Sequence, residues 1–145
     1  MARADFFVRF VAYVIDNVII WLVALVPGVL VGGVGSLAEH ADSGLLNALA
    51  GLLGTTFLAL MVIGQFLYHG YFLSTSGQTP GKRVMNIRVT DRQGGNLSFL
   101  MGGMRGTLGY WLSGSICSLG FLWALFDNDK ETWHDKLFGT AVVHS

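Results

Sequence analysis

Three long stretches of the chain contain no charged residue, and each is long enough to form a membrane-spanning helix. They are residues 17–38, 43–81 and 106–126, with lengths of 22, 39 and 21 positions. A helix needs about 20 predominantly apolar residues to cross the hydrocarbon core of a bilayer, and its backbone must be hydrogen-bonded within the segment. We therefore predict long transmembrane helices over about residues 6–30 and 45–73, with Pro27-Gly28 loosening or ending the first.

The third stretch is less regular than the other two. With the residues before it, it covers about residues 98–126, but small polar residues interrupt it at Ser113-Gly114-Ser115 and Ser118-Leu119-Gly120. Such interruptions are typical of a broken or re-entrant segment. A single straight span would carry the C-terminus to the outside, whereas a re-entrant segment keeps it in the cytoplasm. We favour the re-entrant segment.

Two short segments have the pattern of β-strands. Residues 86–90 alternate apolar and polar side chains and are followed by Gly94-Gly95, and residues 139–143 are rich in β-branched side chains. A lone short strand is unstable, so we expect the two to pair, which requires both on the same side of the membrane. The predicted fold is an all-α membrane protein with two long transmembrane helices, a third broken or re-entrant hydrophobic segment and a small cytoplasmic β pairing. We predict one domain over residues 1–145.

Composition supports the membrane assignment. Hydrophobic residues make up 52% of the 145 residues and charged residues 12%, about half the roughly 25% of a soluble domain. This composition disfavours an ordinary cytosolic enzyme and a disordered segment. The nine basic and nine acidic residues cancel, so no basic excess is available for nucleic acid. The single cysteine, Cys117, cannot form an intrachain disulfide, and we expect neither a metal nor a cofactor.

The distribution of Lys and Arg predicts the orientation of the helices. The loop between the two predicted helices has none, and the segment from residue 74 to residue 105 has five: Lys82, Arg83, Arg88, Arg92 and Arg105. Because basic residues concentrate on the cytoplasmic side, we predict that this segment and the N-terminus lie in the cytoplasm.

Asp16 is the strongest functional signal, because it lies within the first predicted span. Arg9 precedes it by seven positions, which places both on one helix face, about 10 Å apart along the axis. An ionised carboxylate at the centre of a span costs roughly 2.5–3.5 kcal/mol, so Asp16 needs a partner, a proton or water. Arg9 is poorly placed to be that partner, and Lys82 or Arg105 is a better candidate. Asp16 is then part of a structural ion pair, a proton or cation site on a transport path, or an assembly site.

Polar side chains of the second predicted span form a secondary group. Gln65 and His69 are one helical turn apart and can reach Asp16 or Asn17 on the first span. The alternative, which we favour, is that His69 is an interfacial residue beside two tyrosines.

The segment after the second span resembles a phosphate-binding loop only superficially. Between Gly77 and Gly81 there are three residues instead of the four of a Walker motif, and no Ser or Thr follows Lys82. We expect Thr79, Pro80 and Gly81 to form a tight turn, with a positive φ at the glycine. The basic residues around this loop are candidates for binding anionic lipid headgroups: Lys82, Arg83, Arg88 and Arg105.

The C-terminal polar residues do not form a recognisable catalytic or metal motif. His134 and Asp135 are adjacent, and no nucleophile motif accompanies them, so we interpret Trp133 as an interface anchor and expect no enzymatic activity. Asp127, with Asp129 and Glu131 after it, lacks the spacing of a calcium loop.

Several of these segments together resemble the RDD family of small prokaryotic membrane proteins. The matching segments are Arg9 to Asp16, Ser76 to Arg83 with Ile87-Arg88-Val89, Gly120 to Asp127, and His134-Asp135-Lys136 with Gly139 to Val143. The family is named for one arginine and two aspartates. The resemblance assigns the first two roles to Arg9 and Asp16, and the third to Asp135 in preference to Asp127. It implies two membrane spans, a location in the bacterial inner membrane and a link to transport, since some members are reported to resemble sodium/proton antiporters.

Two functions remain in competition at this point. In the first, the protein moves a cation, proton or small solute, with Asp16 as the exchanging carboxylate and Arg9, Asp135 and Arg105 around it. Two spans cannot enclose a pathway alone, so this requires an oligomer or a partner protein. In the second, the protein is a non-transporting accessory or assembly subunit bound to another membrane protein. Both place it in a lipid bilayer, with anionic headgroups as further partners.

Overall fold

The structure, a computed structural model, describes residues 2–115 and 119–145. The chain folds as two compact units, one formed by Val18–Gly64 and the other by Met1–Asn17 with Gln65–Ser145. They are described here one after the other.

Two long helices provide the whole of the first unit. Helix α1 spans Phe6–Ala41 and helix α2 spans Gly44–Thr75, and both have the length and apolar composition needed to cross a membrane. The two predicted spans are therefore confirmed as helices. The predicted end of the first near residue 30 is wrong, because α1 continues through Pro27 for 14 more residues. Proline removes one backbone hydrogen bond but does not stop this helix.

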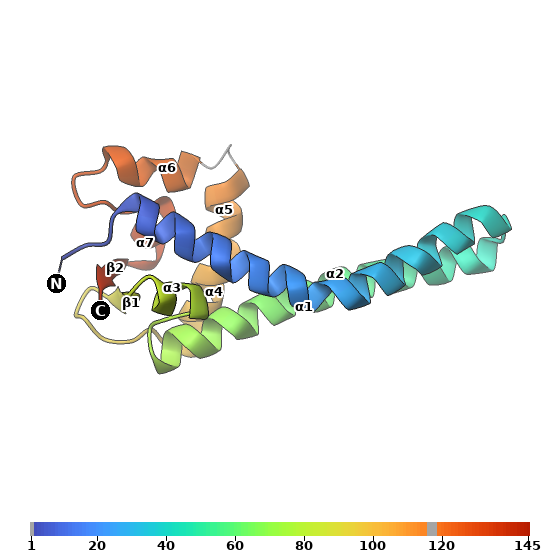
Figure 1. The fold of residues 1–145 in the computed structure, drawn as a ribbon, viewed down its shortest axis with the longest axis horizontal. Helices are drawn as coiled ribbons and strands as arrows, with labels where there is room; N and C mark the ends of the chain where they lie inside the picture. Colours follow the sequence, from blue (N-terminus) through green and yellow to red (C-terminus); the bar gives the residue numbers. More distant parts are fainter. Residues whose placement is uncertain (1, 116–118) are drawn as a thin grey trace. The chain divides into compact units, whose positions relative to one another are not determined.

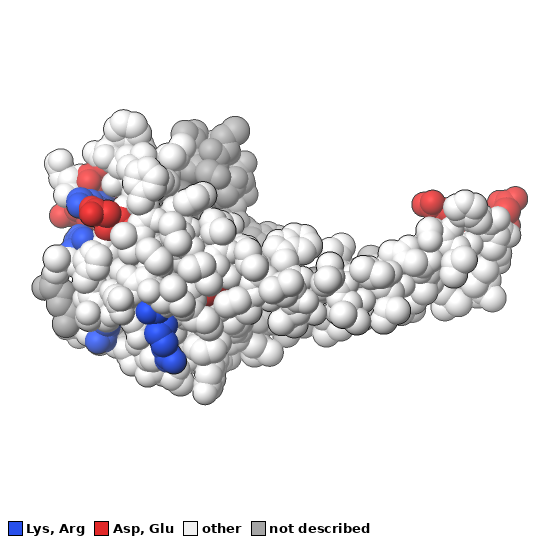
Figure 2. Space-filling model, viewed as in Figure 1, with Lys and Arg blue, Asp and Glu red and all other residues white. Residues whose placement is uncertain are grey.

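The outer surface of this hairpin is apolar. Trp21, Leu22 and Val23 are each more than 60% exposed. In Figure 2 the surface of the hairpin is free of charge except for acidic atoms at its closed end, where the sequence has Glu39 and Asp42. A soluble protein rarely leaves so large an apolar area uncovered, and lipid is the environment that suits it.

The second unit contains the ends of both long helices and all the short elements. These elements are α3 (Pro80–Val84), β1 (Ile87–Asp91), α4 (Phe99–Met104), the π-helical turn η1 (Arg105–Gly109), α5 (Tyr110–Ser115), α6 (Leu119–Phe126), α7 (Trp133–Phe138) and β2 (Thr140–His144). Its apolar core consists of Ala4, Ala12, Leu73, Ile87, Val89, Leu97 and Val142.

The predicted strand pairing is confirmed. Strands β1 and β2 are antiparallel, with Ile87 opposite His144 and Asp91 opposite Thr140. Gly139, at a φ of 60°, ends α7 in the left-handed conformation and so allows β2 to start at once. The N-terminal residues lie beside β2, because the Ala4 N–H donates to the Val142 carbonyl at 2.9 Å, and Figure 1 shows both chain ends at this sheet. The side of the membrane on which the sheet lies stays a prediction.

The third hydrophobic segment forms two helical stretches. Elements α4, η1 and α5 follow one another without a gap over Phe99–Ser115, as one helical run that contains a π-helical turn, and α6 (Leu119–Phe126) is a separate helix of eight residues. Of the two predicted interruptions, Ser113–Ser115 lies at the end of α5, whereas Ser118 lies outside the described residues. Whether the segment re-enters a membrane stays a prediction.

Glycines bring α4 and η1 into close contact with their neighbours. A Cβ atom added at Gly103 would lie 2.7 Å from the ring of Phe66, and one at Gly109 would lie 2.8 Å from His134. At Gly106 it would overlap the ring of His69. These positions therefore fix the packing of the broken segment on α2 and α7.

Candidate functional site

Asp16 is buried and is held by Tyr68 on α2 and by the segment after α2. Its side chain is 1% exposed, and it accepts hydrogen bonds from the Tyr68 hydroxyl at 2.9 Å, the Thr79 hydroxyl at 2.5 Å and the Gly81 N–H at 2.8 Å. The Lys82 ammonium lies 3.7 Å from the second carboxylate oxygen. A carboxylate offers about four acceptor positions, so these donors leave Asp16 nearly saturated.

The segment that holds Asp16 is a short helix and not the tight turn that the sequence predicts. Thr79 is the N-cap of α3 and Pro80 is its first residue, which is the usual place of proline in a helix. Gly81 has a helical conformation, so the expected positive φ is wrong. The glycine is needed for another reason, because a Cβ atom there would collide with the Ala12 carbonyl and lie 2.9 Å from the carboxyl group of Asp16.

Gly77 is the other glycine of this loop motif, and its role is conformational. Its φ is +69°, and its carbonyl accepts the Val89 N–H at 2.7 Å. A side chain at this position would also approach the Val89 carbonyl to 2.7 Å. Gly77 therefore joins the loop to β1.

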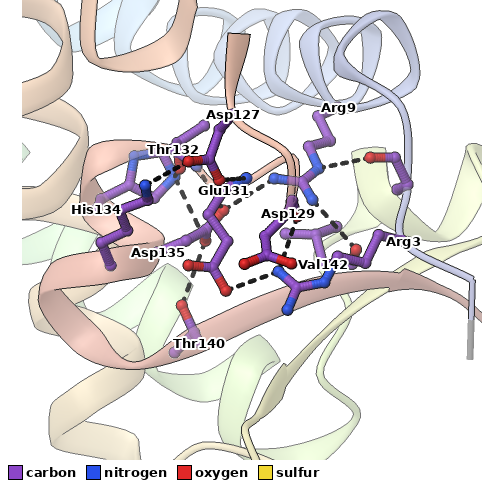
Figure 3. Close-up of polar contacts among 12 residues, drawn as sticks. Arg3, Arg9, Asp127, Asp129, Glu131, Thr132, His134, Asp135, Thr140 and Val142 are labelled. Atoms are coloured by element: carbon purple, nitrogen blue, oxygen red, sulfur yellow. Dashed lines mark hydrogen bonds and ion pairs between the residues drawn. The ribbon is translucent and has the colours of Figure 1, made fainter. Parts of the chain in front are cut away.

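Asp135 is the centre of a second charge cluster (Figure 3). It is completely buried, pairs with Arg9 at 2.8 Å and also with Arg105, and accepts the Thr132 N–H at 3.2 Å. The Thr140 hydroxyl at the start of β2 donates to it at 3.3 Å. Asp135 thus connects four elements: α1, η1, α7 and β2.

Electrostatics keep Asp135 ionised and His134 neutral. Burial alone would raise the pKa of Asp135, but the positive charges around it, Arg105 first, outweigh burial and hold the pKa well below its ordinary value. Burial and the Arg105 charge lower the pKa of His134 to about 3. His134 is therefore uncharged at neutral pH, and its Nε2 lies 3.0 Å from the Thr132 hydroxyl.

The pairing of the predicted charges differs in part from the expectation. Of the two candidate partners of Asp16, Lys82 is the one in contact, and Arg105 instead pairs with Asp135. Arg9 does not turn toward Asp16 along its own helix but reaches Asp135, while it also donates to the Val142 carbonyl at 3.2 Å. The two clusters share the first turns of α1.

The secondary polar residues make local contacts. Asn17 donates to the Tyr13 carbonyl at 2.8 Å, and the Nδ1 atom of His69 lies 2.9 Å from the Gln65 carbonyl. His69 is only 1% exposed, and its position at the membrane interface stays a prediction. The ring lies edge-on to Tyr110, with ring centres 5.3 Å apart.

The remaining acidic and basic candidates lie nearer the surface. Asp127 accepts the Glu131 N–H at 3.0 Å and pairs with Lys136, and Arg3 pairs with Glu131 at 2.6 Å. Arg88 and Arg83 are half-buried and exposed respectively. Across the ranges 2–115 and 119–145, no group of three or more metal-ligating side chains is close enough to hold an ion.

Sequence reasoning missed three hydroxyl groups that complete the clusters. Thr79 precedes a proline, which is a helix N-cap signal that could have been recognised. Tyr68 looks like a member of an aromatic belt, and nothing in the sequence indicates that it binds Asp16. Tyr110, whose hydroxyl accepts from Lys82 at 3.1 Å, gives no sequence signal either.

A cavity of about 170 Å³ adjoins both clusters. Its lining has three cationic side chains, Arg9, Lys82 and Arg105. The apolar lining residues are Phe6, Phe10, Leu122 and Val142, and the uncharged residues with a polar group are Tyr13, Tyr110, Thr132 and His134. No carboxylate belongs to this lining within the described residues. The wall is therefore mostly apolar, and the three cationic side chains contribute a small polar part of it.

Comparison with known proteins identifies the family. The RDD family model matches residues 3–139. The chain is similar to the "Uncharacterized protein YxaI" of Bacillus subtilis, at 29% identity over 97% of each chain. It is also similar to the "Proline-rich antigen homolog" of Mycobacterium tuberculosis, at 28% identity over 94% of this chain and 58% of the relative, and to the "Proline-rich antigen" of Mycobacterium leprae, at 30% over 64% and 38%. This chain thus covers 58% of the length of the first mycobacterial relative and 38% of the length of the second. No solved structure matches. With the match extending over nearly the entire chain, this protein belongs to the RDD family and is of the membrane type.

Proposed function

We propose that this chain is a non-transporting accessory module of the bacterial inner membrane, in which the buried Arg/Asp clusters hold the fold. Helices α1 and α2 anchor the module in the bilayer, with the N-terminus in the cytoplasm. The unit formed by residues 1–17 and 65–145 is the part that assembles with another membrane protein. The observation that carries the proposal is that both buried carboxylates are saturated, or nearly so, by donors of the surrounding elements.

A carboxylate that exchanges a cation must be able to release its partners. Asp16 has three hydrogen bonds, two of them from the rigid start of α3, besides the ion pair with Lys82. Asp135 has two arginines and two further donors. Replacing such donors by a hydrated cation would leave buried polar groups unpaired, which costs roughly 1–3 kcal/mol for each group.

The sign of the charge also argues against a cation site. Three buried or half-buried cations, Arg9, Lys82 and Arg105, face two carboxylates, and His134 is neutral. The combined cluster is therefore positive by one charge. A positive cluster in a low-dielectric environment repels an incoming cation.

The absence of catalytic activity is part of the same proposal. Both oxygens of Asp135 accept from arginines, so the carboxylate cannot serve His134 as the orienting member of a catalytic pair. His134 itself is buried against Thr132.

The test compares Asp16→Asn with Asp42→Asn, a substitution on the exposed turn between α1 and α2. We expect D16N to lower the thermal unfolding midpoint and the recovery of a partner membrane protein on affinity purification in mild detergent, and D42N to leave both unchanged. If D16N matches the wild type in both measurements, the proposal is rejected. Purification of the chain as a homo-oligomer without another protein would favour transport.

Transport of a proton, cation or small solute is the second candidate, because a cavity adjoins the charge clusters. In addition, the buried Nε2 atom of His69 has no hydrogen-bond partner among the residues that the structure describes. The assay is pH-dependent cation flux in proteoliposomes. Flux above that of empty liposomes that D16N abolishes and D42N retains would establish transport, whereas the accessory proposal expects no such flux.

A further inference from the structure

We propose that the cavity lined by Arg9, Lys82 and Arg105 binds the monoanionic phosphodiester of a membrane lipid, with the acyl chain leaving over the apolar part of the lining. This proposal goes beyond the accessory function and does not depend on it. Its evidence is the charge, the hydrogen-bonding state and the rim of this cavity.

The charge of the cavity requires an anion. Its three cations are balanced by only two carboxylates, Asp16 and Asp135, and neither carboxylate is part of the lining. A buried unpaired charge is costly, so a group of charge −1 is the ligand that completes the cluster. Phosphodiesters carry this charge, and arginine and lysine are the side chains that usually bind them.

Arg105 presents a donor that is not fully used. The residue lines the cavity and is 1% exposed, and its Nη2 and Nε atoms donate to Asp135 and Thr140. Its Nη1 atom, in contrast, makes no hydrogen bond of ordinary geometry in the described part of the chain, although the guanidinium also interacts with the Tyr110 hydroxyl. Buried donors are nearly always paired, so this atom indicates a ligand oxygen.

The rim of the cavity is apolar and open. Phe10 on α1 is 49% exposed and Leu122 on α6 is 36% exposed, and both also line the cavity. Phe6, a third lining residue, lies one turn before Phe10, with the two rings stacked at 6.1 Å. This side suits an acyl chain, whereas a free phosphate ion would make no use of it.

The volume is sufficient for the ligand. A cavity of about 150 Å³ accepts a molecule of the size of benzene. The 170 Å³ found here therefore accommodates a phosphate group with a few attached carbon atoms. Lipid and inorganic phosphate share the anionic chemistry, and the experiment distinguishes them.

Two pairs of variants test the site. Lys82→Gln removes one cavity charge and leaves Asp16 its three hydrogen bonds, and Arg83→Gln removes the neighbouring exposed charge. Leu122→Trp fills the cavity without changing any charge, and Leu125→Trp makes the same change on α6 outside the lining. Arg105 is not substituted, because its pairing with Asp135 supports the fold.

The full chain in detergent is titrated with phosphatidylglycerol, with zwitterionic phosphatidylcholine and with inorganic phosphate, and bound ligand is measured by native mass spectrometry. We expect a single phosphatidylglycerol to bind in preference to phosphatidylcholine. K82Q and L122W should each weaken this binding by about tenfold or more, as for the loss of one charge-assisted contact or of the space itself. R83Q and L125W should bind as the wild type does.

Three results would overturn the proposal. The first is equal binding of both lipids. The second is loss of binding in R83Q as large as in K82Q, which would indicate general attraction to anionic surfaces. The third is binding of inorganic phosphate without binding of phosphatidylglycerol, which would exclude a lipid as the source of the anion.

Discussion

Replacing Asp135 by Asn should destabilise the protein more than any other single change of a charge. The side chain is completely buried, and it is the shared partner of Arg9 and Arg105. Asparagine has nearly the same shape and still accepts the Thr132 N–H. The substitution therefore removes the charge with little change in packing.

The size of the effect follows from what the substitution leaves behind. Removing one partner of a buried ion pair costs about 3–5 kcal/mol, because the other charge stays buried without compensation. Arg105 is 1% exposed and cannot turn to solvent, so the upper part of this range applies. A domain has only about 5–15 kcal/mol of stability, so Asp135→Asn removes a large fraction of it.

The assay is equilibrium unfolding in mixed detergent micelles, followed by tryptophan fluorescence. Asp127→Asn is the control, because this carboxylate pairs with Lys136 near the surface and should leave the unfolding midpoint unchanged. The double variant Asp135→Asn/Arg105→Gln should lose less stability than the sum of the two single variants, since it leaves fewer unpaired charges. A D135N protein within about 1 kcal/mol of the wild type, or strict additivity in the double variant, would refute this account of the cluster.

Three further outcomes follow from the same contacts. Gly81→Ala should destabilise the protein by about 1–3 kcal/mol, because the added methyl group overlaps neighbouring atoms. Gly64→Ala, with open space around the added methyl group, should leave the stability unchanged, and unfolding of both variants in micelles measures the difference. Tyr68→Phe removes a donor to Asp16 and should cost about 1.5–3 kcal/mol in the same assay, and an unchanged midpoint would show that the hydrogen bond is dispensable. Because the pKa of His134 is lowered to about 3, the unfolded chain binds more protons than the native one between that pH and about 6.5. The free energy of unfolding should therefore fall on acidification through this window, by at most ~1.4 kcal/mol per pH unit. In His134→Gln the dependence of this free energy on pH should be flatter above about pH 5.

The long helices and the strand pairing could be predicted because their signals are local. Absence of charge over 20 or more positions and alternation over five residues depend only on neighbouring positions. The end of α1 was predicted too early because proline is a helix breaker in isolation, whereas a helix hydrogen-bonded on both sides of Pro27 tolerates it.

The identities of the charged residues could be predicted, but not their pairing. Lys82 and Arg105 were both reasonable partners for Asp16, and only the packing of α3 against α1 selects Lys82. The π-helical turn at Arg105 has no sequence signature, yet it places this guanidinium at Asp135. Long-range pairing of this kind depends on tertiary packing, which a single sequence does not encode in a local pattern.

The spacing of Arg9 and Asp16 explains why one helix can organise two distant segments. The seven positions between them return to nearly the same face of α1, about 10 Å further along. From that face Asp16 binds the start of α3 and Arg9 binds Asp135 at the start of α7. Ala12, midway between them, is completely buried and leaves only enough room for Gly81. The arginine and the two aspartates therefore act together as a single structural device, in which α1 holds the segment after α2 with one charge and the C-terminal segment with the other.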